Sequence, residues 1–329
     1  MKILFVKLSS LGDVVHAMPA LQDIRRALPQ AEIDWVVERA FAPLVQRCEG
    51  VRRVIACELR RWGRSPLSSD TRSEWRAFRN ELQSEVYDAV IDLQGLTKSA
   101  LVARAARLAP GGKRHALANQ TEGSSYEAPT RWVADVAHRV EPHVHAMQRS
   151  RELCALALGY ALPSALRYGL QAKGLAGTGP GAGTVVLVHG SSREDKGWPE
   201  AHWLEIGARL IAGGHPVALA HGTEAERVRG VRLAGRLGPR AEVWPRLELG
   251  ELADRFAASA GVIGVDSGLS HIAVALDRPH VQIYNFDTAW RTGPPAPADA
   301  RGLRQISVYC APTPAVDQVW AAWRQVSAP

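Results

Sequence analysis

The second half of the chain alternates short apolar segments with segments of helical periodicity, and this alternation constrains the fold more than any other feature. We predict strands at 185–189, 216–220, 241–244, 261–265 and 280–284. We predict helices between them at 200–212, 223–236, 249–259 and 269–276. Strands connected by helices in this way form parallel sheets with right-handed crossovers. The pattern therefore predicts a doubly wound α/β domain.

The first half carries the same alternation less regularly. Strands are predicted at 2–7, 33–37, 51–56 and 87–93. Helices are predicted from the loop after residue 7 to Leu28, and at 75–85, 97–108 and 147–158. Segment 109–130 is rich in glycine, proline and polar residues, which indicates a loop. These elements predict a second α/β domain.

At 329 residues, the chain has the length of two domains. The glycine-rich segment 171–184 precedes a strand, whereas a dinucleotide fingerprint follows a strand and opens a helix, so we interpret it as a flexible linker. The predicted domains are 1–170 and 185–312. A final helix within 313–329 is a candidate to pack back on the N-terminal domain. Two such domains enclose a cleft, and ligands bind beyond the carboxyl ends of the strands.

Composition limits the compartment and the partners. Lysine and arginine exceed aspartate and glutamate by seven, and nine arginines fall within 47–79. This excess suits an anionic partner such as a phospholipid surface or an acidic glycolipid. Nucleic acid ranks last among these partners, because the basic stretches have no interleaved aromatic residues and no helix-turn-helix signature.

The N-terminus has the pattern of a strand, not of a signal peptide, so we expect a cytoplasmic protein. The four cysteines lack metal-ligand spacing and predict neither disulfides nor a zinc site.

One candidate reactive loop, residues 9–13, follows the first predicted strand. Gly12 permits a tight turn, and Asp13 lies where a helix begins. Asp13 is either an ordinary helix N-cap or a general base directed into the cleft. For the second role, we expect partial burial to raise the pKa of Asp13.

Three further loops follow strands of the second half. The first offers the hydroxyls of Ser191 and Ser192 and the cation of Lys196, which suits a diphosphate. The second carries Glu224 and Glu226, either of which is a candidate to accept the hydroxyls of a ribose. The third begins at Asp266 and runs directly into a helix, whose N-terminal N–H groups attract phosphates.

The chain resembles the ADP-heptose:lipopolysaccharide heptosyltransferases, which have the GT-B fold. The segments that carry the resemblance are KLSSLGDVVHAMPAL, DWVVERAFAPL, YDAVIDLQGLTKSAL, HGSSREDKGWPEAHW and VDSGLSHIAVALDRP. The first loop and the WVVE segment are most similar to the branch that adds the first heptose to Kdo-lipid A. The resemblance implies inverting transfer of heptose from ADP-heptose to a Kdo residue.

The resemblance also implies roles for the domains and their loops. The N-terminal domain would bind the acceptor, with Asp13 as the catalytic base, and the C-terminal domain would bind ADP-heptose. The implied donor contacts are Ser191, Ser192, Lys196, Glu226, Asp266, Ser267, Gly268, Leu269 and His271. Lys196 would also stabilise the departing ADP. We expect no cofactor and no metal, because no Asp-x-Asp pair is present to hold a metal at a diphosphate.

The acceptor side is predicted from basic residues and the first loop. The candidates are Ser10, Gly12, Arg60, Arg61, Arg64, Lys98, Lys113, Arg114 and Arg131. Kdo-lipid A as acceptor implies peripheral contact with the cytoplasmic face of the inner membrane. A nicotinamide dehydrogenase is disfavoured, since the first turn is not glycine-rich. A later heptosyltransferase of the same family and a non-catalytic nucleotide-sugar-binding protein remain as alternatives.

Overall fold

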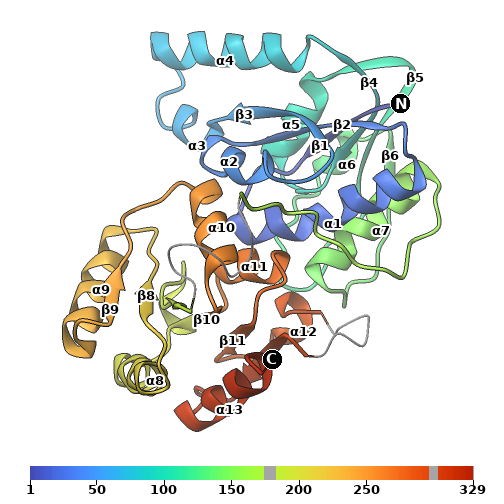
Figure 1. Ribbon diagram of the computed structural model, residues 1–329. Helices are drawn as coiled ribbons and strands as arrows, with labels where there is room; N and C mark the ends of the chain where they lie inside the picture. Colours follow the sequence, from blue (N-terminus) through green and yellow to red (C-terminus); the bar gives the residue numbers. More distant parts are fainter. Residues whose placement is uncertain (174–182, 296–302, 329) are drawn as a thin grey trace. The chain divides into compact units, whose positions relative to one another are not determined.

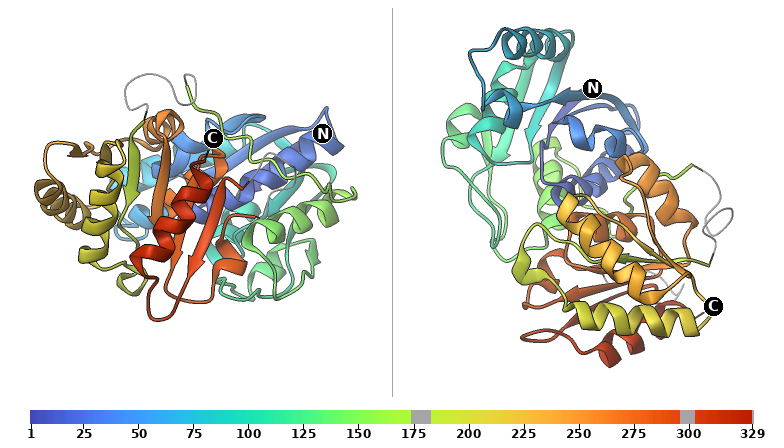
Figure 2. Two further views of the ribbon diagram at one scale, coloured as in Figure 1. Left: turned by 60° about the horizontal axis from the view of Figure 1, so that its bottom comes forward. Right: turned by 90° about the vertical axis from the view of Figure 1, so that its left-hand side faces the viewer.

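The computed structural model describes residues 1–173, 183–295 and 303–328 of the chain (Figures 1 and 2). The chain divides into two compact units, Met1–Leu170 and Gln171–Pro329. The first unit has the same bounds as the N-terminal domain expected from the sequence. Most of the predicted linker, at 174–182, lies outside the described residues.

The N-terminal unit is built on a parallel sheet. Its described strands are β1 (Lys2–Val6), β2 (Glu32–Glu38), β3 (Val51–Cys57), β4 (Val86–Asp92), β5 (Arg107–Leu117) and β6 (Val136–His138). They are ordered β3-β2-β1-β4-β5-β6, and every neighbouring pair is parallel. Residues Ile3–Val6 of the central strand β1 are apolar and fully buried, as expected when helices cover both faces of a parallel sheet.

Helices cover the two faces of this sheet. The longer ones are α1 (Leu11–Ala27), α4 (Ser69–Leu82), α5 (Thr97–Ala105) and α7 (Ala146–Leu158). Short helical turns complete the unit: η1 (Arg39–Phe41), α2 (Ala42–Val45), α3 (Leu59–Trp62) and α6 (Thr130–Val133). Phe78 of α4 and Val102 of α5 share one core with Leu4 of β1. Helices α1 and α7 lie side by side (Figure 1).

A buried ion pair joins α1 to α7. Arg151 donates from Nε to Asp23 Oδ2 at 2.6 Å and from Nη2 to Oδ1 at 3.2 Å, and both side chains are almost fully buried. Burial raises the pKa of Asp23 despite the nearby guanidinium. Removing either side chain would therefore leave the other as an unpaired charge in the interior of the unit.

We expect Arg151→Met to lower the free energy of unfolding by about 3–5 kcal/mol, because it leaves a buried carboxylate without its cation. Urea unfolding of the full chain measures this loss. The matched control is the double variant Asp23→Asn/Arg151→Met, which removes both charges and should recover much of the stability. A loss below about 1 kcal/mol for Arg151→Met, as for an exposed pair, would contradict the prediction.

The C-terminal unit repeats the design. Its described strands are β7 (Val185–Val188), β8 (Val217–Leu219), β9 (Ala241–Val243), β10 (Gly261–Val265), β11 (His280–Tyr284) and β12 (Gln305–Tyr309). They are ordered β12-β11-β10-β7-β8-β9 and are all parallel. The helices are η2 (Glu194–Lys196), α8 (Glu200–Ala212), α9 (Glu224–Leu237), α10 (Leu249–Ala258), α11 (Gly268–Ala275), α12 (Ala289–Thr292) and α13 (Val316–Val326).

The last helix, α13, packs on β11, β12 and α8 of its own unit. Val319, Trp323 and Val326 of α13 are buried in the same core as Trp203 and Leu210 of α8. The apolar side of α13 is therefore part of the C-terminal core.

Three strands escaped the sequence prediction. Strand β5 occupies 107–117, where the sequence pattern predicts the end of a helix and a loop. The pattern misses this strand because Pro110, Gly111 and Gly112 interrupt it, and its register with β4 is irregular. Strands β6 and β12 lie at sheet edges and are only partly buried, so they lack a continuous apolar run.

In the described residues, the helices are too short or too polar to cross a membrane.

Candidate active site

Both units place their candidate residues at the point where the strand order reverses. In the N-terminal unit, the loops after β1 and β4 meet there, because these two strands are neighbours. In the C-terminal unit, the loops after β7 and β10 do so. Parallel doubly wound sheets bind their ligands at such switch points. Each unit therefore has one candidate half-site of its own.

Asp13 is the centre of the N-terminal half-site. It lies in the first turn of α1, where its Oδ2 accepts hydrogen bonds from Ser10 N at 3.2 Å and Ser10 Oγ at 2.9 Å. Its Oδ1 lies 3.6 Å from Lys7 Nζ and 3.5 Å from Arg149 Nη2. The Asp13 side chain is 34% exposed, whereas those of Lys7 and Arg149 are 1% and 8% exposed. The carboxylate is thus reachable from solvent and held from behind by two cations.

The ionisation of Asp13 corrects the sequence expectation. Burial tends to raise its pKa, but the charges of Lys7 and Arg149, with the two Ser10 hydrogen bonds, outweigh burial and lower the pKa to about 2. The expected upward shift is therefore wrong, because it took burial into account and not the cations behind the carboxylate. Asp13 is ionised at every physiological pH.

Lys7 is the main residue that the sequence analysis missed. It follows β1 directly, and its Nζ donates to Leu93 O, in the loop after β4, at 3.0 Å. Burial lowers the pKa of Lys7, while the charges of Asp13 and Asp92 raise it. A lysine at the end of a predicted buried strand is the sequence signal that could have identified it as a site residue. Arg149 gave no such signal, since it lies on α7, far along the chain.

Asp92 and Gln94 fix the loop after β4 against the loop after β1. Asp92 accepts hydrogen bonds from the backbone of Gln94 and Gly95 at 2.9 and 3.1 Å and from Ser99 Oγ at 2.9 Å. Burial raises its pKa to about 6. Gln94 Oε1 accepts from Leu8 N and Ser9 N, each at 3.1 Å. The segment that carries Asp13 is therefore held by a neighbouring strand loop.

The predicted acceptor residues divide into two groups. Ser10 and Gly12 belong to the Asp13 loop, and Arg60 reaches it by donating from Nη2 to Ser9 Oγ at 3.1 Å. Arg61 is paired with Glu58 and Glu74. The others lie on the loop after α3, in α5, in β5 and in α6: Arg64, Lys98, Lys113, Arg114 and Arg131. Of these, Arg114 is engaged with backbone carbonyls at the end of α5.

Asp266 is the centre of the C-terminal half-site. It is 6% exposed, and its Oδ2 accepts a hydrogen bond from Lys196 Nζ at 2.6 Å. Its Oδ1 lies 3.6 Å from His271 Nε2 and accepts from Thr292 Oγ1 at 3.5 Å. Ser191 Oγ donates to the backbone carbonyl of Asp266 at 3.2 Å. The structure thus brings together residues predicted from two separate loops, and adds Thr292.

The loop after Asp266 opens helix α11. Ser267 is the N-cap, and its Oγ accepts a hydrogen bond from Ser270 N at 3.5 Å. Gly268 and Leu269 form the first turn and are half-buried. Their backbone N–H groups have no partner within the helix, which makes this end suited to an anion. Ser192 is exposed in the neighbouring loop.

The structure distinguishes Glu226 from Glu224. Glu224 is exposed and pairs with Arg227 at 2.6 Å between Oε1 and Nη2. The carboxylate of Glu226 accepts from Gly222 N at 2.6 Å and Thr223 N at 3.1 Å, and it lies against Gly190 at the end of β7. A Cβ at Gly190 would lie 2.3 Å from Glu226 Cδ. Glu226 is therefore beside the Ser191 loop, as well as being part of a helix cap.

The described residues contain no group of three or more His, Cys, Asp or Glu side chains placed to share a metal ion. Lys196 and the start of α11 contribute positive charge to the C-terminal half-site.

Comparison with known proteins relates this geometry to a family. Residues 75–317 match the model of glycosyltransferase family 9 (heptosyltransferase). The chain belongs to glycosyltransferase family 9. It is 40% identical over 300 residues to lipopolysaccharide heptosyltransferase 1 of Pseudomonas aeruginosa, covering 89% of this chain and 81% of that protein. Family 9 membership establishes the chain as a glycosyltransferase.

The architecture of this family 9 glycosyltransferase is similar to that of solved structures. The Escherichia coli heptosyltransferase WaaC with ADP superimposes with a TM-score of 0.85, at 33% identity and 98% coverage of both chains. The same enzyme with ADP-2-deoxy-2-fluoro heptose gives a TM-score of 0.81 at 34% identity, again covering 98% of both chains. The predicted α/β architecture of the GT-B type, with two parallel sheets, is thereby confirmed.

Proposed function

We propose that this family 9 glycosyltransferase transfers L-glycero-D-manno-heptose from ADP-heptose to a Kdo residue of Kdo-lipid A in lipopolysaccharide inner-core synthesis. The observation that carries the proposal is the position of Asp13, which is reachable from solvent and lies at the switch point of one unit beside Lys7 and Arg149. The Lys196–Asp266 pair at the switch point of the other unit supports it. Similarity to heptosyltransferase 1 and to structures with ADP and an ADP-heptose analogue supports the donor.

The chemistry is a single displacement with inversion. A Kdo hydroxyl oxygen attacks the anomeric carbon of heptose, and the bond from that carbon to the β-phosphate oxygen breaks. The hydroxyl proton passes to Asp13, and ADP leaves with the electron pair. Because Asp13 is stabilised by two cations, it is a weak base towards a free alcohol. It accepts the proton as the new C–O bond forms, when the hydroxyl becomes strongly acidic.

The donor is held by charge and by oriented N–H groups. The Lys196 ammonium has three N–H donors and uses one of them on Asp266, which fixes the position of the lysine side chain. Its other N–H donors are able to contact a diphosphate. The N-terminus of α11 and the hydroxyls of Ser191, Ser192 and Ser267 complete the proposed phosphate contacts. Glu226 is proposed to bind the ribose hydroxyls. We propose that no metal or other cofactor takes part.

Mass spectrometry of Kdo-lipid A tests the proposal after incubation with purified protein and ADP-heptose. A mass increase of one heptose is expected, with release of ADP. A parallel reaction on Kdo-lipid A that already carries one heptose separates the later heptosyltransferase activity. Absence of product from both acceptors would refute heptose transfer, and a product from the second acceptor alone would assign the later step. The proposal also places the protein in the cytoplasm, in peripheral contact with the inner membrane.

Lys7→Met is expected to make the activity sensitive to acid. Removing this cation raises the pKa of Asp13, which Lys7 and Arg149 hold near 2. A general base acts only when deprotonated, so activity is lost as pH falls through its pKa. The acidic limb of kcat/KM therefore moves to higher pH in the variant.

The control for this experiment is Lys2→Met, since Lys2 is a half-exposed lysine at the other end of β1 and is paired with Glu85. This variant should keep the original pH profile. Circular dichroism of both variants checks the fold. An acidic limb that does not move in Lys7→Met would show that Lys7 does not set the ionisation of Asp13.

A further inference from the structure

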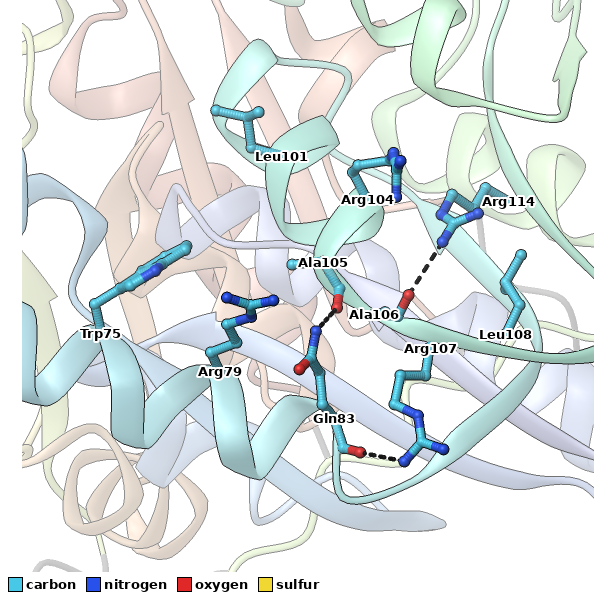
Figure 3. Close-up of a pocket in the computed structure, with 10 residues that line it drawn as sticks. All are labelled: Trp75, Arg79, Gln83, Leu101, Arg104, Ala105, Ala106, Arg107, Leu108 and Arg114. Atoms are coloured by element: carbon cyan, nitrogen blue, oxygen red, sulfur yellow. Dashed lines mark hydrogen bonds between the residues drawn. The ribbon is translucent and has the colours of Figure 1, made fainter.

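A basic pocket lies in the N-terminal unit between α4, α5 and the start of β5 (Figure 3). Its volume is about 550 Å³. Four arginines line it, Arg79, Arg104, Arg107 and Arg114, and its lining contains no carboxylate. The pocket is not part of the half-site described above. It lies where α5 ends and β5 begins, whereas Asp13 follows the carboxyl end of β1.

Two of the arginines have a structural role. Arg114 donates to Ala103 O at 3.0 Å and to Ala106 O at 3.1 Å, which caps the carbonyls at the end of α5. It also pairs with Asp135 at 3.7 Å between Nη1 and Oδ2. Arg107 Nη1 donates to Gln83 O at 3.0 Å. The Arg114 contacts satisfy carbonyls at the end of α5, and the Arg107 contact satisfies one at the end of α4, so these helix ends do not need the remaining cations.

The other two arginines have no structural role of this kind. The guanidinium groups of Arg79 and Arg104 are exposed and have no hydrogen-bond or ion-pair partner in residues 1–173, 183–295 and 303–328. Figure 3 shows Arg79 reaching from α4 towards α5. Two guanidinium groups without a partner, beside two fixed ones, give the pocket an uncompensated positive charge. Arginine recognises the planar oxygen pairs of phosphate through paired N–H donors.

The wall of the pocket is also apolar in part. Trp75 and Leu101 line it together with the arginines, and Leu101 is 59% exposed. An exposed leucine next to unpartnered cations fits a ligand that carries both a negative charge and hydrocarbon. A bare inorganic anion would use the arginines and leave the exposed side chain of Leu101 without a contact.

We propose that this pocket binds a phosphate group, supplied by the headgroup of an anionic phospholipid whose chain lies along Trp75 and Leu101. The site would anchor the N-terminal unit on an anionic bilayer. Basic residues near such a surface contribute to binding individually, and contact with hydrocarbon adds to it. The inference extends the membrane contact included in the proposed function but does not depend on heptose transfer.

Vesicle sedimentation of the full chain tests the proposal. The probes are phosphatidylcholine vesicles with and without phosphatidylglycerol, and inorganic phosphate titrated by calorimetry. The pocket variant is Arg79→Gln/Arg104→Gln. The matched control is Arg72→Gln/Arg76→Gln, which removes the same charge from exposed positions of α4 outside the pocket lining. Leu101→Ser removes the apolar contact and keeps the charges.

We expect binding to vesicles that contain phosphatidylglycerol, and a loss of about tenfold or more in the pocket variant. The control should lose less than about threefold, as expected for open surface charges. Leu101→Ser should weaken vesicle binding and leave phosphate affinity unchanged. If only inorganic phosphate binds, with the same dependence on Arg79 and Arg104, the anion site is supported and its source is a soluble phosphate.

Equal losses in the pocket variant and its control would overturn the proposal, since the binding would then be diffuse over α4. Absence of binding to both probes would also overturn it. Thermal unfolding confirms that each variant is folded. Heptose transfer to a deacylated, water-soluble acceptor is measured in parallel and should be unchanged in the pocket variant. Failure of that transfer in the unsubstituted protein would refute the proposed function and leave the phosphate site unaffected.

Discussion

Asp13→Asn is expected to lower the turnover number for heptose transfer by ~10²–10⁴-fold, the typical contribution of a positioned general base. The asparagine keeps the size of the side chain and an oxygen that accepts from Ser10, but it cannot take a proton. Affinity for ADP should be unchanged, because the proposed donor contacts belong to the other unit. Single-turnover kinetics and calorimetry measure the two effects separately.

The control for Asp13→Asn is Asp70→Asn, an exposed carboxylate in the first turn of α4. It should retain normal turnover. Asp13→Asn also removes a negative charge beside Lys7 and Arg149. Thermal unfolding of this variant must therefore be compared with that of the unsubstituted protein. Near-normal turnover of a folded Asp13→Asn protein would remove Asp13 from the role of base.

Lys196→Ala is expected to weaken ADP binding by roughly 10–100-fold, the range for a hydrogen bond from a charged donor, and to slow transfer as well. Calorimetry with ADP and steady-state kinetics measure the two effects. Lys196→Arg, which keeps the charge, should recover part of the affinity. Lys173→Ala, an exposed lysine of the same unit, is the control and should have no effect.

A second variant is needed for Lys196, because its removal also leaves the buried carboxylate of Asp266 without a cation. Adding Asp266→Asn to Lys196→Ala removes that unpaired charge. If the double variant regained full affinity for ADP, the effect of Lys196→Ala would come from Asp266 and not from a lost phosphate contact. Affinity that remains low in the double variant supports direct contact.

The sequence predicted those parts of the fold that bury a continuous apolar run. Strands β1 and β10 and the helices that follow them were found close to their observed bounds, because each is apolar and ends at a distinct polar loop. Strand β5 was missed because charges and a Pro-Gly-Gly interruption removed its periodicity. Edge strands such as β12 bury too little to give a pattern.

The candidate site was predictable where it lies within one loop and not where distant segments meet. Ser10 with Asp13, and Ser267 with Ser270, are local contacts of a helix start. The approach of Arg149 to Asp13 depends on how α7 packs on α1, which local pattern does not specify. The pKa of Asp13 was therefore predicted in the wrong direction.

The two cations behind Asp13 also bear on inhibitor design. Both come from the same folded unit as the carboxylate, so its negative charge is present before any ligand arrives and persists throughout the physiological pH range. A compound that carries an ammonium group in place of the attacking hydroxyl would gain an ionic contact there.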